Sequence, residues 1–299
     1  LKTHHPAAFL AGVLTHDPGM YPKRLLLDDA RTLGVAVLPL DVNASHDTYR
    51  VERLDEADRG PAPTHPDLPD GSSYGIRLSL TDVKGISAAE VASVIAGQPY
   101  ADLGDFWERA HVSRPVVERL VLAGAFDVLH GIVAGGGPGR RSRMTRRDLL
   151  LHVAELDRWH RSLSAGRRRH TPRPRITVAP AADDVAAQAA AQSQAARPVV
   201  PAAQQSVQLL LDLGDRPELR TGSGLPELTG IERVRAELDV LGLDASSHVV
   251  ATYAPMLAAL GVTRSRDLLQ ARSRSEIWVA GVKVATQTPP IRTGRRVVF

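Results

Sequence analysis

The stretch "LTDVKGISAAEVASVI", residues 80 to 95, holds the residue types best suited to contact an anion. Lys84, Gly85 and Ser87 lie just before an amphipathic segment, and Ser87 and Glu90 have the spacing of a helix capping box. A tight turn before a helix N-terminus can present backbone N–H groups to a phosphate, and a lysine adds positive charge. The same residues also suit an ordinary capped turn with an exposed lysine, and the turn by itself does not decide between the two.

A second turn of this kind is predicted in "FWERAHVSRPVVERLVLAGAFDVL". Phe106 and Trp107 belong to one predicted helix. Ser113 is the expected N-cap of the next helix, with Pro115 in its first turn and Gly124 as its C-cap. Two short helix-turn-helix units in succession indicate a compact helical module.

Positive charge is concentrated further along the chain. Residues 140 to 175 contain twelve arginines, beginning with Arg140 and Arg141, against three acidic residues. One helix is predicted in this tract, from about Thr145 to Leu163. The tract is either a solvated linker or an arm that contacts phosphates, in which case its binding would be independent of sequence and sensitive to salt.

An Ala/Pro/Gln-rich, low-complexity stretch follows and predicts a disordered linker. At its end stands "QLLLDL", in which Gln208, Leu211 and Leu213 could enter an apolar groove of a partner. The alternative is that these leucines begin the next folded segment.

Composition excludes several classes of protein. The chain has no cysteine, and its 43% hydrophobic and 23% charged residues are ordinary for a globular protein with a small excess of positive charge. His4, His5 and His16 lack the spacing of a metal site, and "GGGPGR" lacks the lysine of a P-loop. No apolar run reaches the length of a membrane helix, so a cytoplasmic protein is expected.

The predicted fold class is mainly α with a small β part. Helices are expected from Pro6 to Leu14, from about Tyr21 to Leu33 with Gly34 as C-cap, and from about Thr229. Residues 54 to 73 form a predicted loop, "YGIRLSL" a short strand, and the residues from about 274 two strands that begin a small barrel. A chain that starts at Leu1 and stops inside a predicted strand is expected to be a fragment.

Several stretches together resemble one family. "KTHHPAAFLAGVL", "ARTLGVAVLPLDVN", "YGIRLSLTDVKGIS", "VERLVLAGAFDVL", "ERVRAELDVLGLD" and "VAGVKVATQTPP" stand in the order found in bacterial C-family replicative polymerases, the polymerase III alpha subunits. "LPLDVN" and the last stretch are most similar to the error-prone alpha-type polymerase of damage tolerance. The resemblance covers nearly the whole chain except residues 135 to 205.

The resemblance implies a domain plan. Residues 1–58 would be the end of the fingers domain, 59–134 a tandem helix-hairpin-helix module that grips duplex DNA, and 135–224 a basic linker with one helix. Residues 225–272 would be a helical connector and 273–299 the truncated start of an OB-fold barrel that binds single-stranded template.

The resemblance also implies partners and sites. The parent enzyme would be a DNA-directed DNA polymerase that uses Mg²⁺ and binds primer-template DNA. DNA contacts are expected from Lys84, Gly85, Ser87, Arg114, Arg140 and Arg141. The sliding clamp is a second expected partner, although "QLLLDL" lacks the terminal aromatic residue of the family's clamp-binding peptide.

The chain departs from the family in what it lacks. The catalytic aspartates lie in a palm domain upstream of Leu1, so we expect this chain to bind DNA without catalysing synthesis. Two other classes stay open from the residues themselves: a helix-hairpin-helix repair nuclease, which would need a carboxylate cluster, and a non-catalytic adaptor protein that acts through "QLLLDL".

Overall fold

The computed structural model describes residues 1–17, 19, 21–65, 67–132, 144–169, 216–219 and 222–283, with side chains described as far as Leu163 in the helix that ends at residue 169. The chain divides into two compact units: Leu1–Asp157 together with Pro217–Phe299, and Arg158–Arg216. The sheet and both predicted turns lie in the first unit. Arg140, Arg141, Gln208, Leu211 and Leu213 lie outside the described residues, as does most of the predicted linker.

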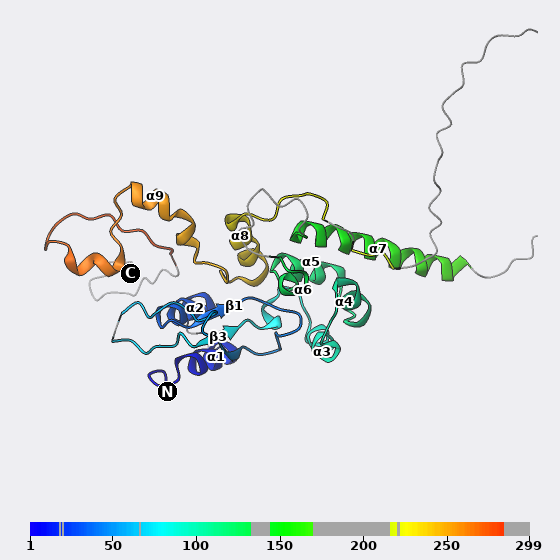
Figure 1. Ribbon diagram of the computed structural model, residues 1–299, viewed down its shortest axis with the longest axis horizontal. Coiled ribbons are helices and arrows are strands. Elements are labelled where there is room, and N and C mark those ends of the chain that lie inside the picture. Colours follow the sequence, from blue (N-terminus) through cyan, green and yellow to red (C-terminus); the bar gives the residue numbers. More distant parts are fainter. Residues whose placement is uncertain are drawn as a thin grey trace, which may run out of the picture. The chain divides into compact units, whose positions relative to one another are not determined.

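Helices account for most of the regular structure (Figure 1). The α-helices are α1 (Pro6–His16), α2 (Lys23–Thr32), α3 (Ala88–Gly97), α4 (Leu103–Arg109), α5 (Arg114–Leu122), α6 (Asp127–His130), α7 (Arg146–Arg169), α8 (Gly230–Leu241) and α9 (Ala254–Ala259). The 3-10 helices are η1 (Leu80–Asp82), η2 (Val249–Tyr253) and η3 (Ser265–Gln270), and the strands are β1 (Ala36–Leu38), β2 (Arg50–Arg53) and β3 (Tyr74–Arg77). Among these described helices, none is both long enough and apolar enough to cross a membrane.

A three-stranded sheet follows the first two helices. β3 lies in the middle, parallel to β1 and antiparallel to β2. Ile76 of β3 pairs with Val37 and with Val51, and its side chain is fully buried. α1 packs against α2, β2 and β3, and α2 packs against β1. The two helices together therefore support the sheet, whose central strand leads into the first turn.

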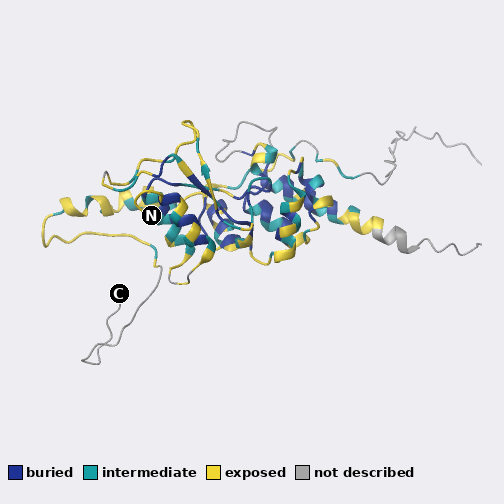
Figure 2. Ribbon diagram, turned by 90° about the horizontal axis from the view of Figure 1, so that it is seen from below, coloured by how far each residue is buried: buried dark blue, intermediate teal, exposed yellow. Residues whose placement is uncertain are grey.

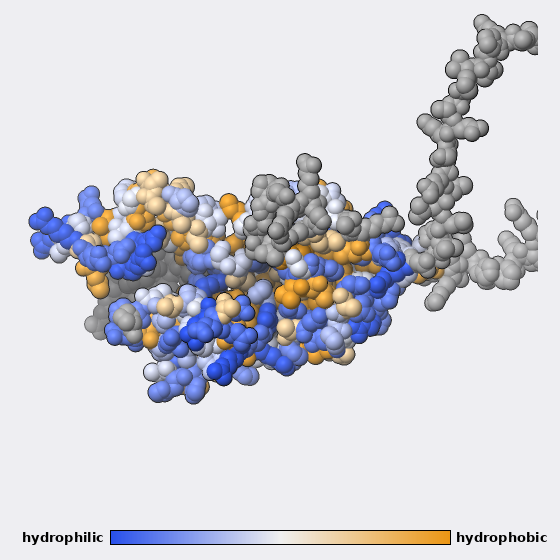
Figure 3. Space-filling model, viewed as in Figure 1, coloured by the Kyte–Doolittle hydropathy of each residue, from blue (hydrophilic) through white to orange (hydrophobic). Residues whose placement is uncertain are grey.

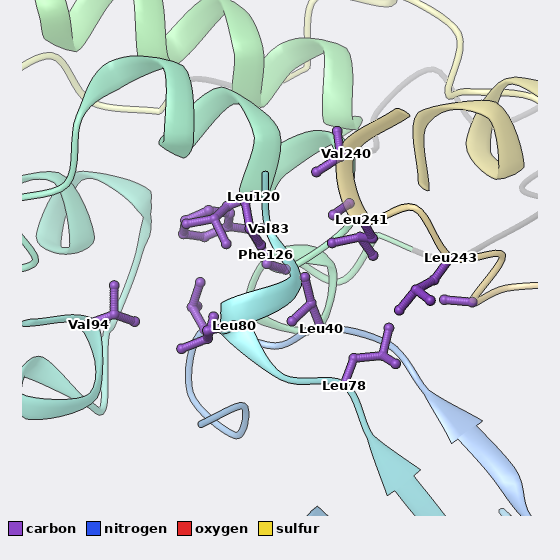
Figure 4. Packing of buried hydrophobic residues seen from close by; sticks show 14 of the residues in the cluster. Leu40, Leu78, Leu80, Val83, Val94, Leu120, Phe126, Val240, Leu241 and Leu243 are labelled. Atoms are coloured by element: carbon purple, nitrogen blue, oxygen red, sulfur yellow. The ribbon is translucent and has the colours of Figure 1, made fainter. Parts of the chain in front are cut away.

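One hydrophobic core runs through the first unit, and its members line the inner faces of the helices and the sheet (Figure 2). Phe106 stands edge-on to Tyr100 and to Phe126, with ring centroids 4.8 and 5.0 Å apart, a favourable arrangement for aromatic pairs. Val240 and Leu241, at the end of α8, join the same core near Val83 (Figure 4). A segment from late in the sequence therefore completes the core around the first turn.

The helices predicted from Pro6, from about Tyr21, from about Thr145 and from about Thr229 are confirmed within two residues at their starts. The strand predicted in "YGIRLSL" is confirmed over its first four residues as β3, whereas its last residue, Leu80, begins η1. The described residues from 54 to 73 contain no helix or strand, as predicted. β2 was not predicted. Its only apolar residue is Val51, and β2 forms because it pairs along its whole length with β3.

The strands predicted from about residue 274 do not form over the part that the structure describes. Residues 275–283 have no regular structure, and Ile277, Trp278 and Val279 are exposed. An alternating sequence becomes a strand only when another strand accepts its hydrogen bonds, and no described strand lies beside this one. The rest of the predicted barrel, residues 284–299, lies outside the described residues.

No residue from 246 to 283 is buried, although several of them are large and apolar. Tyr253, Met256 and Leu260 are more than half exposed. Figure 3 shows hydrophobic residues over α9 on the face in view.

Candidate nucleic-acid interface

The first turn, residues 83–87, joins η1 to α3. Gly85 has a φ of 78°, a left-handed conformation that residues with a side chain seldom adopt. A Cβ at this position would also come within 2.5 Å of the Arg119 guanidinium. Ile86 is half-buried against the core, and Ser87 is the N-cap of α3. The left-handed backbone is the main reason for glycine here, since the Arg119 guanidinium ends a flexible side chain that can move away from an added Cβ.

Lys84 is exposed, and its ammonium contacts the C-terminal end of α8. It donates to the Asp239 carbonyl at 2.6 Å and approaches the Leu238 carbonyl at 3.5 Å, while the Lys84 N–H donates to the Val240 carbonyl at 3.0 Å. A cation at a helix C-terminus complements the helix dipole and satisfies carbonyls that have no partner within the helix. Lys84 thus anchors α8 to the turn. An ammonium has three donors, so it retains capacity for a further acceptor.

Arg119 contributes a second cation to the first turn. Its guanidinium Nη1 donates to the Lys84 carbonyl at 2.6 Å, and it forms no salt bridge with a described carboxylate. Arg114, at the start of α5, differs in this respect. Its guanidinium donates to Glu118 and to Asp157, each at 2.8 Å, and these bonds raise its pKa. Arg119 is therefore the less compensated of the two arginines.

The second turn, residues 110–113, joins α4 to α5 and repeats the geometry of the first. His111 has a φ of 50°, in the place that Gly85 occupies in the first turn. Val112 is half-buried against the core, as Ile86 is, and Ser113 is the N-cap of α5. The order left-handed residue, apolar residue, N-cap serine thus occurs twice.

Glu90 joins the two turns. Its Oε2 accepts hydrogen bonds from the N–H and the hydroxyl of Ser87 at 2.8 and 2.9 Å. Its Oε1 accepts from the N–H and the hydroxyl of Ser113 at 2.9 and 2.8 Å. Partial burial by itself raises the pKa of Glu90, but these four donors outweigh it and lower the pKa to about 2. The carboxylate is therefore ionised at neutral pH and caps two helices at once.

Some N–H groups around the first turn have no acceptor among the described residues. They belong to Gly85 and to Ala88 and Ala89, the first two residues of α3. The Ser87 N–H already donates to Glu90, so it is not free to donate to a phosphate. These three N–H groups, close to Lys84 and Arg119, can donate hydrogen bonds to the oxygens of one phosphate.

The structure brings four of the predicted residues together: Lys84, Gly85 and Ser87 in the first turn, and Arg114 directly after the second. Sequence reasoning missed Arg119, His111 and the second role of Glu90. The serine that ends each turn was a visible signal, but the link between the two serines depends on how α3 and α5 pack.

The described residues contain no group of three His, Asp or Glu side chains that could hold a metal ion. These residues therefore do not fit the Mg²⁺ site of a polymerase.

The geometry of the turns agrees with the comparisons. A family model described as a helix-hairpin-helix motif matches residues 34–132, which include both turns. An error-prone DNA polymerase of Symbiobacterium thermophilum is 30% identical over 309 aligned residues, covering 100% of this chain and 25% of that protein. Over its whole length, the chain is thus similar to part of an error-prone DNA polymerase.

Two further error-prone DNA polymerases are also similar to this chain. One from Sinorhizobium medicae is 28% identical over 98% of this chain and 22% of its own length. One from Azoarcus sp. is 38% identical over 44% of this chain and 12% of its own length. The chain thus spans about a quarter, or less, of the error-prone DNA polymerases that it matches.

Proposed function

We propose that this chain is a duplex-binding portion of an error-prone DNA polymerase that acts in damage tolerance, and that its two hairpin turns grip the DNA backbone. The observation that carries the proposal is the pair of turns with one geometry, joined by Glu90 and lying within a helix-hairpin-helix match. Binding of this kind contacts phosphates and does not read bases.

The first turn supplies the donors for one phosphate. The N–H groups of Gly85, Ala88 and Ala89 lie at the N-terminus of α3, where the helix dipole also favours an anion. The remaining donor capacity of Lys84 and the guanidinium of Arg119 add positive charge. Ser87 and Glu90 hold the turn in shape. Arg114 directly follows the N-cap serine of the second turn, as Ala88 follows that of the first, and would add a further cation. Arg140 and Arg141 would extend the basic surface.

The domain plan follows the same proposal. Residues 1–58 would end the fingers, 59–134 would be the hairpin module, and 135–224, 225–272 and 273–299 would be the linker, the connector and the start of an OB domain. The shared core between the first two parts means that they would move as one body. The whole polymerase would use Mg²⁺ for nucleotide addition and would act on primer-template DNA, with the sliding clamp as a further partner.

The test is fluorescence-anisotropy binding of the 299-residue chain to a labelled primer-template duplex at a series of salt concentrations. We expect log K to fall linearly with log salt, with a slope of about −0.9 for each phosphate contacted. Duplexes of different sequence should bind equally. Absence of binding even at low salt would overturn the proposal.

Lys84→Glu tests the turn directly. We expect weaker binding to all sequences alike and a salt slope smaller by about 1, because one phosphate contact is lost. Lys2→Glu is the matched control, since it makes the same charge change at an exposed lysine before α1. Unfolding of both variants is measured in parallel because Lys84 also anchors α8. Unchanged affinity of Lys84→Glu at low salt would exclude a phosphate contact at Lys84.

A primer-extension assay with magnesium and all four deoxynucleotides completes the test. We expect no extension by this chain alone. Extension would mean that residues of this chain catalyse nucleotide addition.

A further inference from the structure

We propose that Glu90 is a positioning residue that sets the spacing of the two hairpin turns, so that both turns engage the backbone of one duplex at the same time. The proposal rests on the proposed function for its meaning in DNA binding, while its structural part stands on the hydrogen bonds of Glu90 alone.

The first argument is the form of the link. One carboxylate oxygen holds Ser87 through two bonds, and the other oxygen holds Ser113 through two bonds. A carboxylate is rigid and planar, so the two N-cap residues are fixed at a short and defined separation. A flexible or monodentate contact would leave the turns free to shift against each other.

The second argument is the hydrogen bonding of Ser113, the N-cap residue of α5. An N-cap serine ordinarily accepts a hydrogen bond from the first turn of its own helix. The Ser113 hydroxyl makes no such bond and donates to Glu90 instead. The second turn is thus tied to the first through Glu90 and not only through its own helix.

A third argument comes from comparison within the chain. Glu232 has the same relation to α8 that Glu90 has to α3, accepting from the N–H and the hydroxyl of Thr229 at 2.8 and 3.0 Å. Among the described residues, its second oxygen accepts a hydrogen bond only from the Arg147 guanidinium, at 3.1 Å. A capping box therefore needs one Ser or Thr, and the second serine at Glu90 is additional to capping.

Electrostatics and positioning predict opposite changes in DNA affinity when the Glu90 carboxylate is removed. A negative charge beside a phosphate site weakens phosphate binding by repulsion, so its removal alone would strengthen binding. If Glu90 positions the turns, its removal weakens binding in spite of the lost repulsion. The two effects have opposite directions.

The experiment compares wild type, Glu90→Gln and the matched control Glu232→Gln in the salt-series binding assay. We expect Glu90→Gln to bind DNA several-fold more weakly than wild type. The magnitude of its slope of log K against log salt should be smaller by about 1, because one turn no longer reaches its phosphate. Glu232→Gln should leave the slope unchanged. Equal or tighter binding of Glu90→Gln would overturn the proposal.

A distance measurement makes the test independent of DNA. Because the chain has no cysteine, nitroxide labels can be placed at Ala92→Cys on α3 and Pro115→Cys on α5, both exposed in the structure. We expect Glu90→Gln to broaden the distribution of label distances and Glu232→Gln to leave it unchanged. An unbroadened distribution in Glu90→Gln would overturn the positioning role.

The two readouts separate the proposals. If wild type does not bind duplex DNA, the proposed function fails, and the label distances still decide whether Glu90 fixes the turns. If wild type binds and the Glu90→Gln slope is unchanged, the function stands and the positioning role fails.

Discussion

At the scale of single residues, both turns contain one residue in the left-handed conformation, but that residue is glycine in the first turn and histidine in the second. Gly85 takes its left-handed conformation without a steric cost, whereas His111 takes one at a φ of 50° with a side chain present. The space above Gly85 is filled by the Arg119 guanidinium, which donates to the Lys84 carbonyl.

Replacement of Gly85 by alanine should therefore be destabilising. We expect Gly85→Ala to lower the free energy of unfolding by about 1–2 kcal/mol, because of its left-handed backbone, and to displace Arg119 from Lys84. Urea unfolding measures the loss. Gly12→Ala is the control, because Gly12 lies inside α1 with open space around it and should gain roughly 0.5–1 kcal/mol. A Gly85→Ala protein as stable as wild type would contradict the need for glycine.

At the scale of elements, acidic residues in the first turn hold several helices to their surroundings. Glu90 begins α3 and reaches α5. Asp148 in the first turn of α7 accepts from Thr145 and also from the N–H of Ser223 at 2.9 Å. Glu232 caps α8 and accepts a hydrogen bond from Arg147 of α7 at 3.1 Å. In each case a helix start is also a point where two segments meet, but only Glu90 and Asp148 accept from a backbone N–H of the second segment.

The bonds of Glu90 should make stability depend on pH in a defined window. Its pKa of about 2 in the folded chain lies below the ordinary value of 4.5, so its contribution is present above pH 4.5 and lost as the pH falls toward 2. We expect the difference in unfolding free energy between wild type and Glu90→Gln to be constant above pH 5 and to vanish near pH 2. Denaturant unfolding at a series of pH values measures it. A difference that persists undiminished at pH 2 would contradict the assigned bonds.

Local signals in the sequence predicted many of the helices and the central strand. Ser87 with Glu90 predicted the start of α3, and "YGIRLSL" predicted a strand, whose first four residues form β3. Contacts between distant residues were not predictable. The acceptor for Lys84 lies 155 residues further along the chain, and no local pattern identifies it.

At the scale of the whole first unit, one core unites the sheet, the hairpin helices and the end of α8. α2 is joined to the segment after α8 as well: the Arg31 guanidinium donates to the carbonyls of Asp244 and Ala245. Asp244 is fully buried, 3.7 Å from Arg24. The end of α8 thus contacts the first turn, and the residues directly after α8 contact α2.

Replacement of Phe106 tests whether the sheet and the hairpin helices share one core. It is fully buried between Tyr100 and Phe126, so Phe106→Ala should lower the free energy of unfolding by about 3–5 kcal/mol. The loss should appear in a single transition that reports on the sheet and the hairpin helices together. Trp278→Ala is the control, since Trp278 is 76% exposed and should change stability by no more than about 0.5 kcal/mol. Separate transitions for the sheet and the hairpin helices would contradict a shared core.

The bond between Lys84 and Asp239 has a consequence for synthesis on the ribosome. The first turn emerges long before α8, and 155 residues separate the two partners. At roughly 5–20 residues per second, the nascent chain waits about 8–30 seconds for the helix that covers Val83 and its neighbours. During that interval this apolar surface faces solvent, where a chaperone can bind it and where two nascent chains can associate.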